Sequence, residues 1–195
     1  MSKKQRVDRR VRRTRALLQN SLLDLLQKKR LAKIQIKEIT AHADLSRQAF
    51  YLHFDSKEAL LFSYLDDVFA QIHQALFEEA LNAKSLDLKA LAIMSFELWA
   101  EHAEALQWVM QVKDKDMLIT RLRRHVAALM EAVAEHPKSH ITKHPQHEHV
   151  VDFVTGGIYM LFRRFFSEGM KSSAEEMGLL AFQLIEGSIH LKIKP

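Results

Sequence analysis

The stretch IKEITAHADLSRQAFYLHF at residues 36–54 decides the fold of the N-terminal part of the chain. Residues 36–43 place apolar side chains on one side of about two helical turns. A turn of three residues follows, and its last residue, Ser46, is a natural N-cap for a second short helix that begins at Arg47. Two short helices joined by such a turn, behind a longer helix, predict a helix-turn-helix.

The apolar residues of this stretch can close a small core with the helix that precedes it. Such a core would present the outer face of the second short helix to a major groove of DNA. The predicted core residues are Leu18, Leu22, Leu25, Ile36, Ile39, Leu45, Ala49, Phe50 and Phe54.

Charge is unevenly distributed along the 195 residues. Residues 1–60 carry 15 Lys or Arg and 6 Asp or Glu, a net charge of +9, whereas residues 61–195 carry 14 and 18, a net charge of −4. This basic N-terminal segment indicates a polyanionic partner, with nucleic acid the first candidate and an anionic membrane surface the second.

The composition excludes several classes of protein. The chain has no cysteine, which excludes disulfides, cysteine-ligated metals and thiol catalysis. No apolar run reaches the ~18 residues that a membrane span needs, and the charged N-terminus lacks the apolar core of a secretory signal. We expect a cytoplasmic protein with no membrane contact. Without a glycine-rich phosphate loop or a nucleophile elbow, we expect no enzyme, no catalytic residue and no cofactor.

The chain is predicted to be all-α. None of its five glycines lies before Gly156, it has three prolines, and residues that favour helices dominate. About nine helices are expected. Beyond the helix-turn-helix they should cover residues 57–82, 85–101, 103–111, 115–136, 147–168 and 173–191, with a polar loop at 136–149.

Residues 33–61 resemble the DNA-binding segment of the tetracycline-repressor (TetR) family of bacterial regulators. Thr14 and Arg15 also match the usual start of the family's first helix. One departure is Asp44, which replaces a turn glycine at a position that usually adopts a left-handed conformation. A second departure is the pair Gln48-Ala49. At these two positions the family often has Gly or Pro, followed by Thr. The matching positions within the segment are Ile36, Glu38, Ile39, Ala43, Leu45, Ser46, Tyr51, His53, Phe54, Lys57, Glu58 and Leu60.

The resemblance implies roles for individual residues. Arg47 and Gln48 would read bases, because Arg suits guanine and Gln suits adenine in the major groove. Leu52 would touch a thymine methyl group or, alternatively, pack inside the domain. The phosphate contacts would come from Ser46, Tyr51, His53 and Lys57, with Lys37 reaching a base or a phosphate and Arg9, Arg12, Arg13 and Arg15 adding backbone contacts. For Tyr51 and His53, packing within the small domain is the alternative.

The resemblance also implies a division into a helix-turn-helix DNA-binding domain at 1–56 and a helical domain for dimerisation and ligand binding at 57–195. The family dimerises through its last two helices, here 147–168 and 173–191. The sequence favours this independently, because the Gly156-Gly157 pair is costly within a helix unless another backbone approaches closely. A dimer would bind a pseudo-palindromic operator.

The mode of regulation has several possible forms. The first is a repressor released by a small apolar effector, which would bind near Met94, Trp99, Trp108 and Met117; plain core packing explains these residues equally well. The second is an activator or coregulator that needs no ligand. The third is a metal-responsive regulator that uses the histidines of residues 136–149, although their spacing favours a solvated loop and no metal site is expected. These histidines are His136, His140, His144, His147 and His149.

Overall fold

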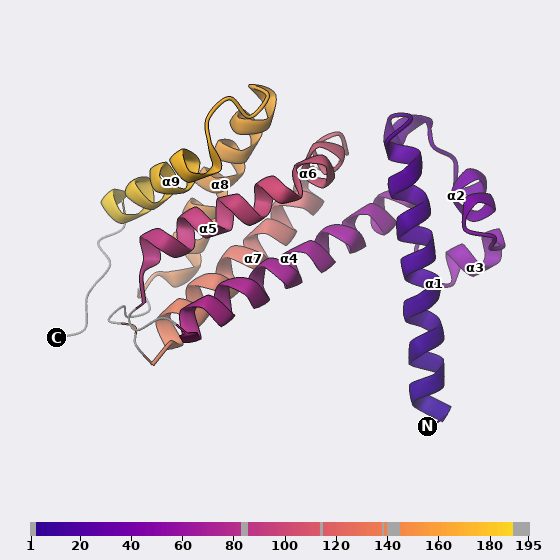
Figure 1. Cartoon of the computed structure of the whole chain (residues 1–195), viewed down its shortest axis with the longest axis horizontal. Coiled ribbons are helices and arrows are strands. Elements are labelled where there is room, and N and C mark those ends of the chain that lie inside the picture. Colours follow the sequence, from indigo (N-terminus) through magenta and orange to yellow (C-terminus); the bar gives the residue numbers. More distant parts are fainter. Residues whose placement is uncertain (1–2, 83–85, 114, 138, 140–144, 189–195) are drawn as a thin grey trace. The chain divides into compact units, whose positions relative to one another are not determined.

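The computed structural model describes residues 3–82, 86–113, 115–137, 139 and 145–188, and for residues 3–8, 187 and 188 only the backbone. Within this part of the chain all regular structure is helical, which confirms the predicted all-α fold (Figure 1). The elements are α1 (Lys3–Leu26), the 3₁₀ turn η1 (Leu31–Lys33), α2 (Ile36–His42), α3 (Arg47–Tyr51), α4 (Lys57–Asn82), α5 (Leu88–Glu101), α6 (Ala103–Met110), α7 (Lys115–Glu135), α8 (His147–Ser167) and α9 (Ala174–Ser188).

The chain forms two units, each described by itself below. The N-terminal unit comprises Met1–Asp66 and Trp108–Lys113, and the C-terminal unit comprises Asp67–Gln107 and Asp114–Pro195. The predicted boundary after residue 56 concerns a functional division and stays a prediction.

Local signals in the sequence set the ends of several helices. Ser46 caps α3, because its Oγ accepts a hydrogen bond of 3.0 Å from the backbone N–H of Ala49. Asp44, in the turn before it, has a φ of 53°, the left-handed conformation predicted for this position. Ser56 caps α4 in the same way, through the N–H of Ala59. Each cap satisfies a backbone N–H that the first turn of a helix leaves unpaired.

The core of the N-terminal unit holds α3 in place. α1 packs on α2, and α2 packs on α3. A helix of five residues has no stability of its own, so the buried side chains must fix its orientation. Of the predicted core residues, Leu18, Leu22, Ile39, Phe50 and Phe54 are buried, whereas Leu25, Ile36, Leu45 and Ala49 are half-buried.

In the C-terminal unit, α5 packs lengthwise against α9, and α7 packs against α8 (Figure 1). The guanidinium of Arg123 on α7 bridges the carboxylates of Glu148 and Asp152 on α8. α8 ends in a Schellman motif at Gly169, whose φ is 72°: the N–H of Met170 donates to the carbonyl oxygen of Phe165. α9 begins with a capping box.

That capping box is formed by Ser173 and Glu176. The backbone N–H of Glu176 donates to the Oγ of Ser173, and the backbone N–H of Ser173 donates to the carboxylate of Glu176. Satisfying both donors fixes the first turn of α9 and therefore the position of its apolar face along α5.

Gly178 lets α9 approach α5 at backbone distance. A Cβ at residue 178 would lie 2.5 Å from the Cα of Ile93 and 2.9 Å from the carbonyl oxygen of Ala92. Both contacts are with backbone atoms, so rotation of a side chain cannot relieve them. The two helices would have to move apart.

We therefore expect Gly178→Ala to destabilise the protein by about 1–2 kcal/mol, because the overpacking exceeds the ~1 kcal/mol that alanine gains over glycine in a helix. Thermal unfolding followed by circular dichroism measures the difference. Gln183→Ala, at an exposed position of the same helix, should change stability by less than about 0.5 kcal/mol. A Gly178→Ala protein as stable as the natural one would show that the close packing of α5 and α9 is not required.

Candidate functional site

The outer face of α3 presents polar and aromatic side chains to solvent. Arg47 and Gln48 are exposed, and Tyr51 is 50% exposed, with its ring edge against the ring of Phe50 at 5.5 Å between centroids. Leu52, for which the sequence left two roles open, is 75% exposed, so it does not pack inside the unit. The predicted base-reading residues therefore lie on one accessible surface.

Two of the predicted phosphate ligands have structural partners. The ammonium of Lys57 donates hydrogen bonds to the carbonyl oxygens of Leu31 (2.7 Å) and Ile34 (2.8 Å) and so fastens the 3₁₀ turn to the start of α4. Ser46 is the α3 cap described above. Sequence reasoning missed the role of Lys57, because nothing in the local sequence shows that residues 31–34 return to it. A phosphate contact by either residue stays a prediction.

The remaining predicted contacts differ in exposure. Lys37 is exposed on α2, and His53 is half-buried, with its ring 6.5 Å from that of Phe54. The guanidinium of Arg15 lies over the ring of Phe54, 4.5 Å from its centroid, so Arg15 also stabilises the core through a cation–π contact.

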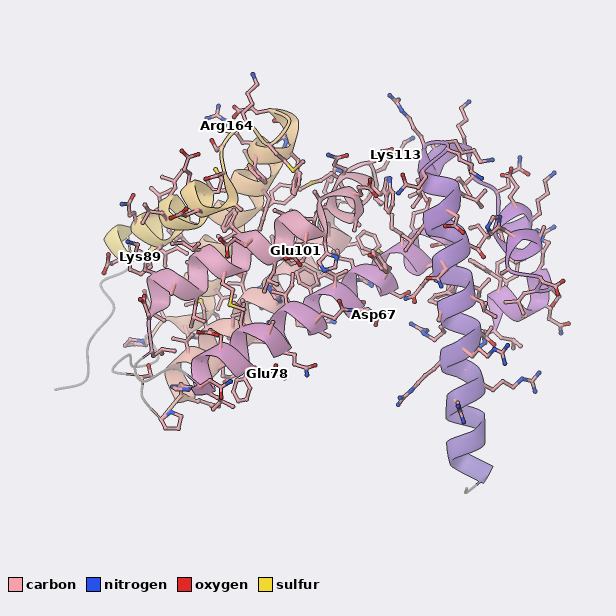
Figure 2. All side chains as sticks on the ribbon, viewed as in Figure 1. Asp67, Glu78, Lys89, Glu101, Lys113 and Arg164 are labelled. Atoms are coloured by element: carbon pink, nitrogen blue, oxygen red, sulfur yellow. The ribbon has the colours of Figure 1, made fainter. Side chains whose placement is uncertain are left out.

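Basic side chains cover the surface of the N-terminal unit. Long side chains with nitrogen tips stand out along α1 (Figure 2). Glu38, one of the acids in this region, is paired with the ammonium of Lys29, which lowers the pKa of the carboxyl group. The unit therefore presents a positive surface suited to phosphate oxygens. The exposed cations include Arg9, Arg10, Arg12, Arg13, Lys28, Arg30, Lys33, Lys37 and Arg47.

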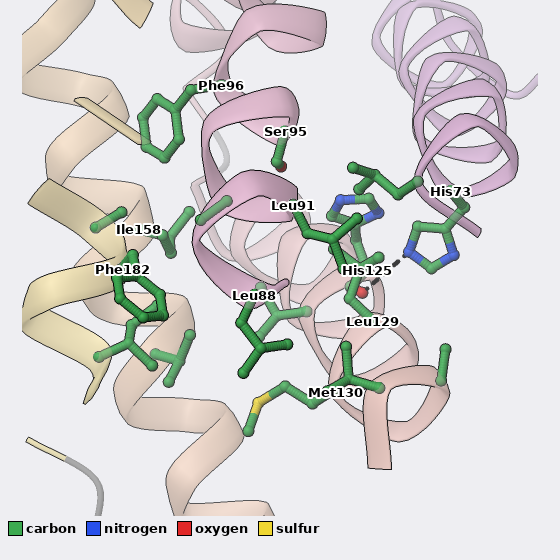
Figure 3. A pocket seen from close by; sticks show the side chains of 18 of the residues that line it. His73, Leu88, Leu91, Ser95, Phe96, His125, Leu129, Met130, Ile158 and Phe182 are labelled. Atoms are coloured by element: carbon green, nitrogen blue, oxygen red, sulfur yellow. Dashed lines mark hydrogen bonds between the residues drawn. The ribbon is translucent and has the colours of Figure 1, made fainter. Parts of the chain in front are cut away.

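The C-terminal unit contains a partly open cavity of about 500 Å³ (Figure 3). It is lined mainly by apolar side chains from α4, α5, α7, α8 and α9. Trp99, one of the four residues predicted for an effector pocket, lines it. Met94, Trp108 and Met117 do not line it, and Trp108 belongs to the N-terminal unit.

Two histidines lie at one side of the cavity (Figure 3). The His73 Nε2 lies 3.2 Å from the backbone carbonyl oxygen of His125 and must carry the hydrogen, because a carbonyl only accepts. The His125 ring is 6% exposed and packs against the rings of His73 (4.3 Å), Phe69 (4.4 Å) and Trp99 (5.8 Å). Neither of its nitrogens has a hydrogen-bond partner among the described residues.

Burial controls the protonation of these rings. Desolvation lowers the pKa of His125 to about 3, with a further contribution from His73, and desolvation also lowers the pKa of His73. Both rings are therefore neutral at pH 7. The sequence held one signal for His125: it falls on the apolar face of α7, between Leu122 and Val126, where an ordinary solvated histidine would not lie.

The histidine-rich segment is only partly described. His140 and His144 lie outside the described residues, His136 is buried and lines the cavity, and His147 and His149 begin α8. Within the described part of the chain, no group of three His, Cys, Asp or Glu residues is arranged to hold a metal ion.

No helix among the described residues is long and apolar enough to cross a membrane.

The protonation of His125 makes stability depend on pH. The unfolded chain takes up this proton near pH 6.5 and the folded protein only near pH 3, so the unfolded state binds more protons between these values and stability falls as pH falls. We expect the natural protein to lose about 2 kcal/mol more than His125→Leu between pH 7 and pH 5. Urea unfolding at both pH values measures this, and equal losses would contradict a neutral, buried His125.

Two family profiles match the chain. One, described as "Bacterial regulatory proteins, tetR family", matches residues 22–64 and so covers α2, α3 and the start of α4. The other, described as "Transcriptional regulator C-terminal region", matches residues 87–187, which is more than half of the chain.

Individual curated proteins agree with these profile matches. The chain is 41% identical over 71 residues to an uncharacterised HTH-type regulator, YxbF, of Bacillus subtilis (36% of this chain, 19% of that protein), and 39% identical over 64 residues to the HTH-type regulator EthR of Mycobacterium tuberculosis (33% and 30%). The matched segment thus spans less than a third of either curated relative.

Two solved structures share the fold. A TetR transcriptional regulator from Streptococcus agalactiae superposes with a TM-score of 0.63 at 19% identity, over 93% of this chain and 98% of that one. The dihydroxyacetone kinase operon activator DhaS superposes with a TM-score of 0.61 at 16% identity, over 91% and 96%. These two structures show the fold alone, and the two profiles show that the chain belongs to the TetR family of helix-turn-helix transcriptional regulators.

Proposed function

We propose that the protein is a homodimeric, cytoplasmic repressor that binds a pseudo-palindromic DNA operator and is released from it by a small molecule. The observation that carries the DNA-binding part is the exposed outer face of α3, held rigid by the buried rings of Phe50 and Phe54 within a strongly basic unit. The functional division is then 1–56 for DNA binding and 57–195 for dimerisation and effector binding.

The side chains of this face have chemistry suited to separate tasks. Arg47 and Gln48 provide donors and an acceptor for base edges, and the exposed Leu52 offers an apolar surface to a thymine methyl group. Tyr51, His53 and Lys37 provide hydrogen bonds or charge for phosphate oxygens. Two further phosphate contacts are predicted. Ser46 would provide one, and the other would come from the N–H of the Lys57 ammonium that neither carbonyl group uses.

We expect Arg47→Ala to cost about 1–3 kcal/mol on the selected sequence and to relax preference at one base position in each half-site. Selection from random duplexes first identifies the bound sequence, and fluorescence anisotropy then measures affinity at several salt concentrations. Tyr51→Phe, which removes only the hydroxyl, should weaken binding to all sequences alike.

Lys89→Ala is the control, because it removes a cation at an exposed position of α5 in the other unit and should leave DNA affinity unchanged. Affinity that does not fall with rising salt would contradict a phosphate-contacting surface.

The dimer contact is assigned to one face of α8 and α9. Phe153, Gly156, Gly157 and Met160 follow helical spacing along α8, and all four are exposed in the single chain, Phe153 to 61% and Met160 to 53%. A Cβ on either glycine would meet no atom of the described chain within 4 Å. Gly156 and Gly157 thus do not accommodate a helix of their own chain, unlike Gly178, and a second copy is the partner that explains them.

α9 extends the same apolar surface. Leu180 and Leu184, one turn apart, are 40% and 50% exposed, and α8 packs against α9. Apolar side chains left uncovered on adjacent helices suit an interface between copies, because burying them is favourable and stable interfaces need about 1,200–2,000 Å².

Met160→Lys should yield a folded monomer, because the side chain is exposed within the chain but would carry a charge into the interface, which weakens association roughly 30-fold or more. Analytical ultracentrifugation at micromolar concentration measures the mass. Ala90→Lys, which adds a lysine at an exposed position of α5, should remain dimeric. A dimeric Met160→Lys protein would place the interface elsewhere.

Release by a small molecule is supported by the cavity, whose volume of about 500 Å³ lies within the ~300–1,000 Å³ typical of ligand sites. A ligand regulates only if it favours one arrangement of the dimer over another. The alternative to repression is activation of transcription. The DhaS structure, which has the same fold, is named an operon activator. Transcription from a promoter that contains the selected operator, with and without the regulator, decides between the two signs.

A further inference from the structure

The walls of the cavity favour an apolar ligand. Leu88, Leu91, Leu129 and Met130 line one part, and Phe96, Ile158 and Phe182 line another (Figure 3). An apolar molecule that enters such a space loses unfavourable contact with water and gains close packing.

His125 adds a polar requirement to this apolar space. Its ring lines the cavity, is 6% exposed and has no hydrogen-bond partner for either nitrogen among the described residues. A buried polar group without a partner is destabilising, and few are left so in folded proteins. The neutral imidazole has one N–H donor and one acceptor nitrogen, so it can pair with a hydroxyl or a carbonyl group.

The charges around the cavity argue against an ionic ligand. The described lining residues include no Lys or Arg, and their one carboxylate, Glu186, is exposed on α9. His73 and His125 are neutral at pH 7, because burial lowers the pKa of both rings. A carboxylate or phosphate would therefore lose its hydration without gaining a counter-charge from Lys, Arg, His73 or His125, and an ammonium group would lose its own beside these two neutral rings.

We propose that this cavity takes an uncharged, mainly apolar molecule with a single hydroxyl or carbonyl group, which hydrogen-bonds to the imidazole of His125. The assignment names the ligand class for the effector role proposed above and presupposes that role. His125 is thereby the residue that determines specificity, and the apolar walls provide most of the affinity.

A displacement assay on the full-length protein at pH 7.5 tests the ligand class. The reporter is 1,6-diphenylhexatriene, a hydrocarbon that fluoresces in apolar surroundings and has no hydrogen-bonding group. The competitors share a ten-carbon chain: 1-decanol, decanoate and decylammonium. We expect 1-decanol to displace the reporter at a concentration at least tenfold below that of either ion. Equal or tighter binding of decanoate or decylammonium overturns the proposal, as does a protein that binds neither reporter nor alcohol.

Variants of His125 test the hydrogen bond. His125→Leu should weaken 1-decanol binding about tenfold and leave diphenylhexatriene binding unchanged, because only the alcohol uses the imidazole. His125→Gln, whose amide also has a donor and an acceptor, should recover most of that loss. His42→Leu makes the same substitution in the N-terminal unit and should change neither affinity. Unaltered alcohol binding by His125→Leu overturns the assignment.

Two further measurements locate binding and separate it from regulation. Ala132→Trp places an indole into the cavity wall and should abolish binding of both molecules; undiminished binding would locate them elsewhere and overturn the proposal. Operator affinity is then measured with and without 1-decanol. If the alcohol binds as described and operator affinity does not change, the ligand class stands and the effector role fails.

Discussion

Burial of Phe50 and Phe54 is the interaction on which the outer face of α3 depends. The two rings are 0% and 5% exposed, and their centroids lie 6.0 Å apart. An isolated helix shorter than about 12–15 residues is marginal in water, so α3, with five residues, derives its orientation from this core. Arg15 over the Phe54 ring and Lys57 on the carbonyls of the 3₁₀ turn reinforce the same arrangement.

Glycine residues have two separate structural roles in the C-terminal unit. Gly178 faces the backbone of α5 at a distance that no side chain would permit, so it belongs to the packing of the single chain. Gly156 and Gly157 face open space on an exposed apolar stripe of α8, so the packing of the single chain does not explain them, whereas the proposed dimer would. The sequence marks all three as costly within a helix, and only their surroundings separate the two roles.

The imidazole of His125 lies in an apolar space, without a hydrogen-bond partner in the part of the chain that the structure describes. His125 packs against the rings of Phe69 and Trp99, which hold it in place, and desolvation keeps it neutral. A leucine at this position would fit the apolar pattern of α7 and avoid an unsatisfied buried group. The histidine is therefore better explained by recognition of a polar group than by stability.

The sequence by itself determined the helical class and most helix ends, because capping residues such as Ser46 and Ser173 and breakers such as Gly169 act within one or two turns. It also determined the left-handed turn at Asp44 and the family. Only the tertiary structure decided that Lys57 bonds to carbonyl groups 23 and 26 residues earlier, that Leu52 is exposed and that Trp99 rather than Met94 or Met117 lines the cavity. The physical reason is range: caps and turns are local hydrogen bonds, whereas burial depends on which distant helices meet, and neighbouring residues do not encode this.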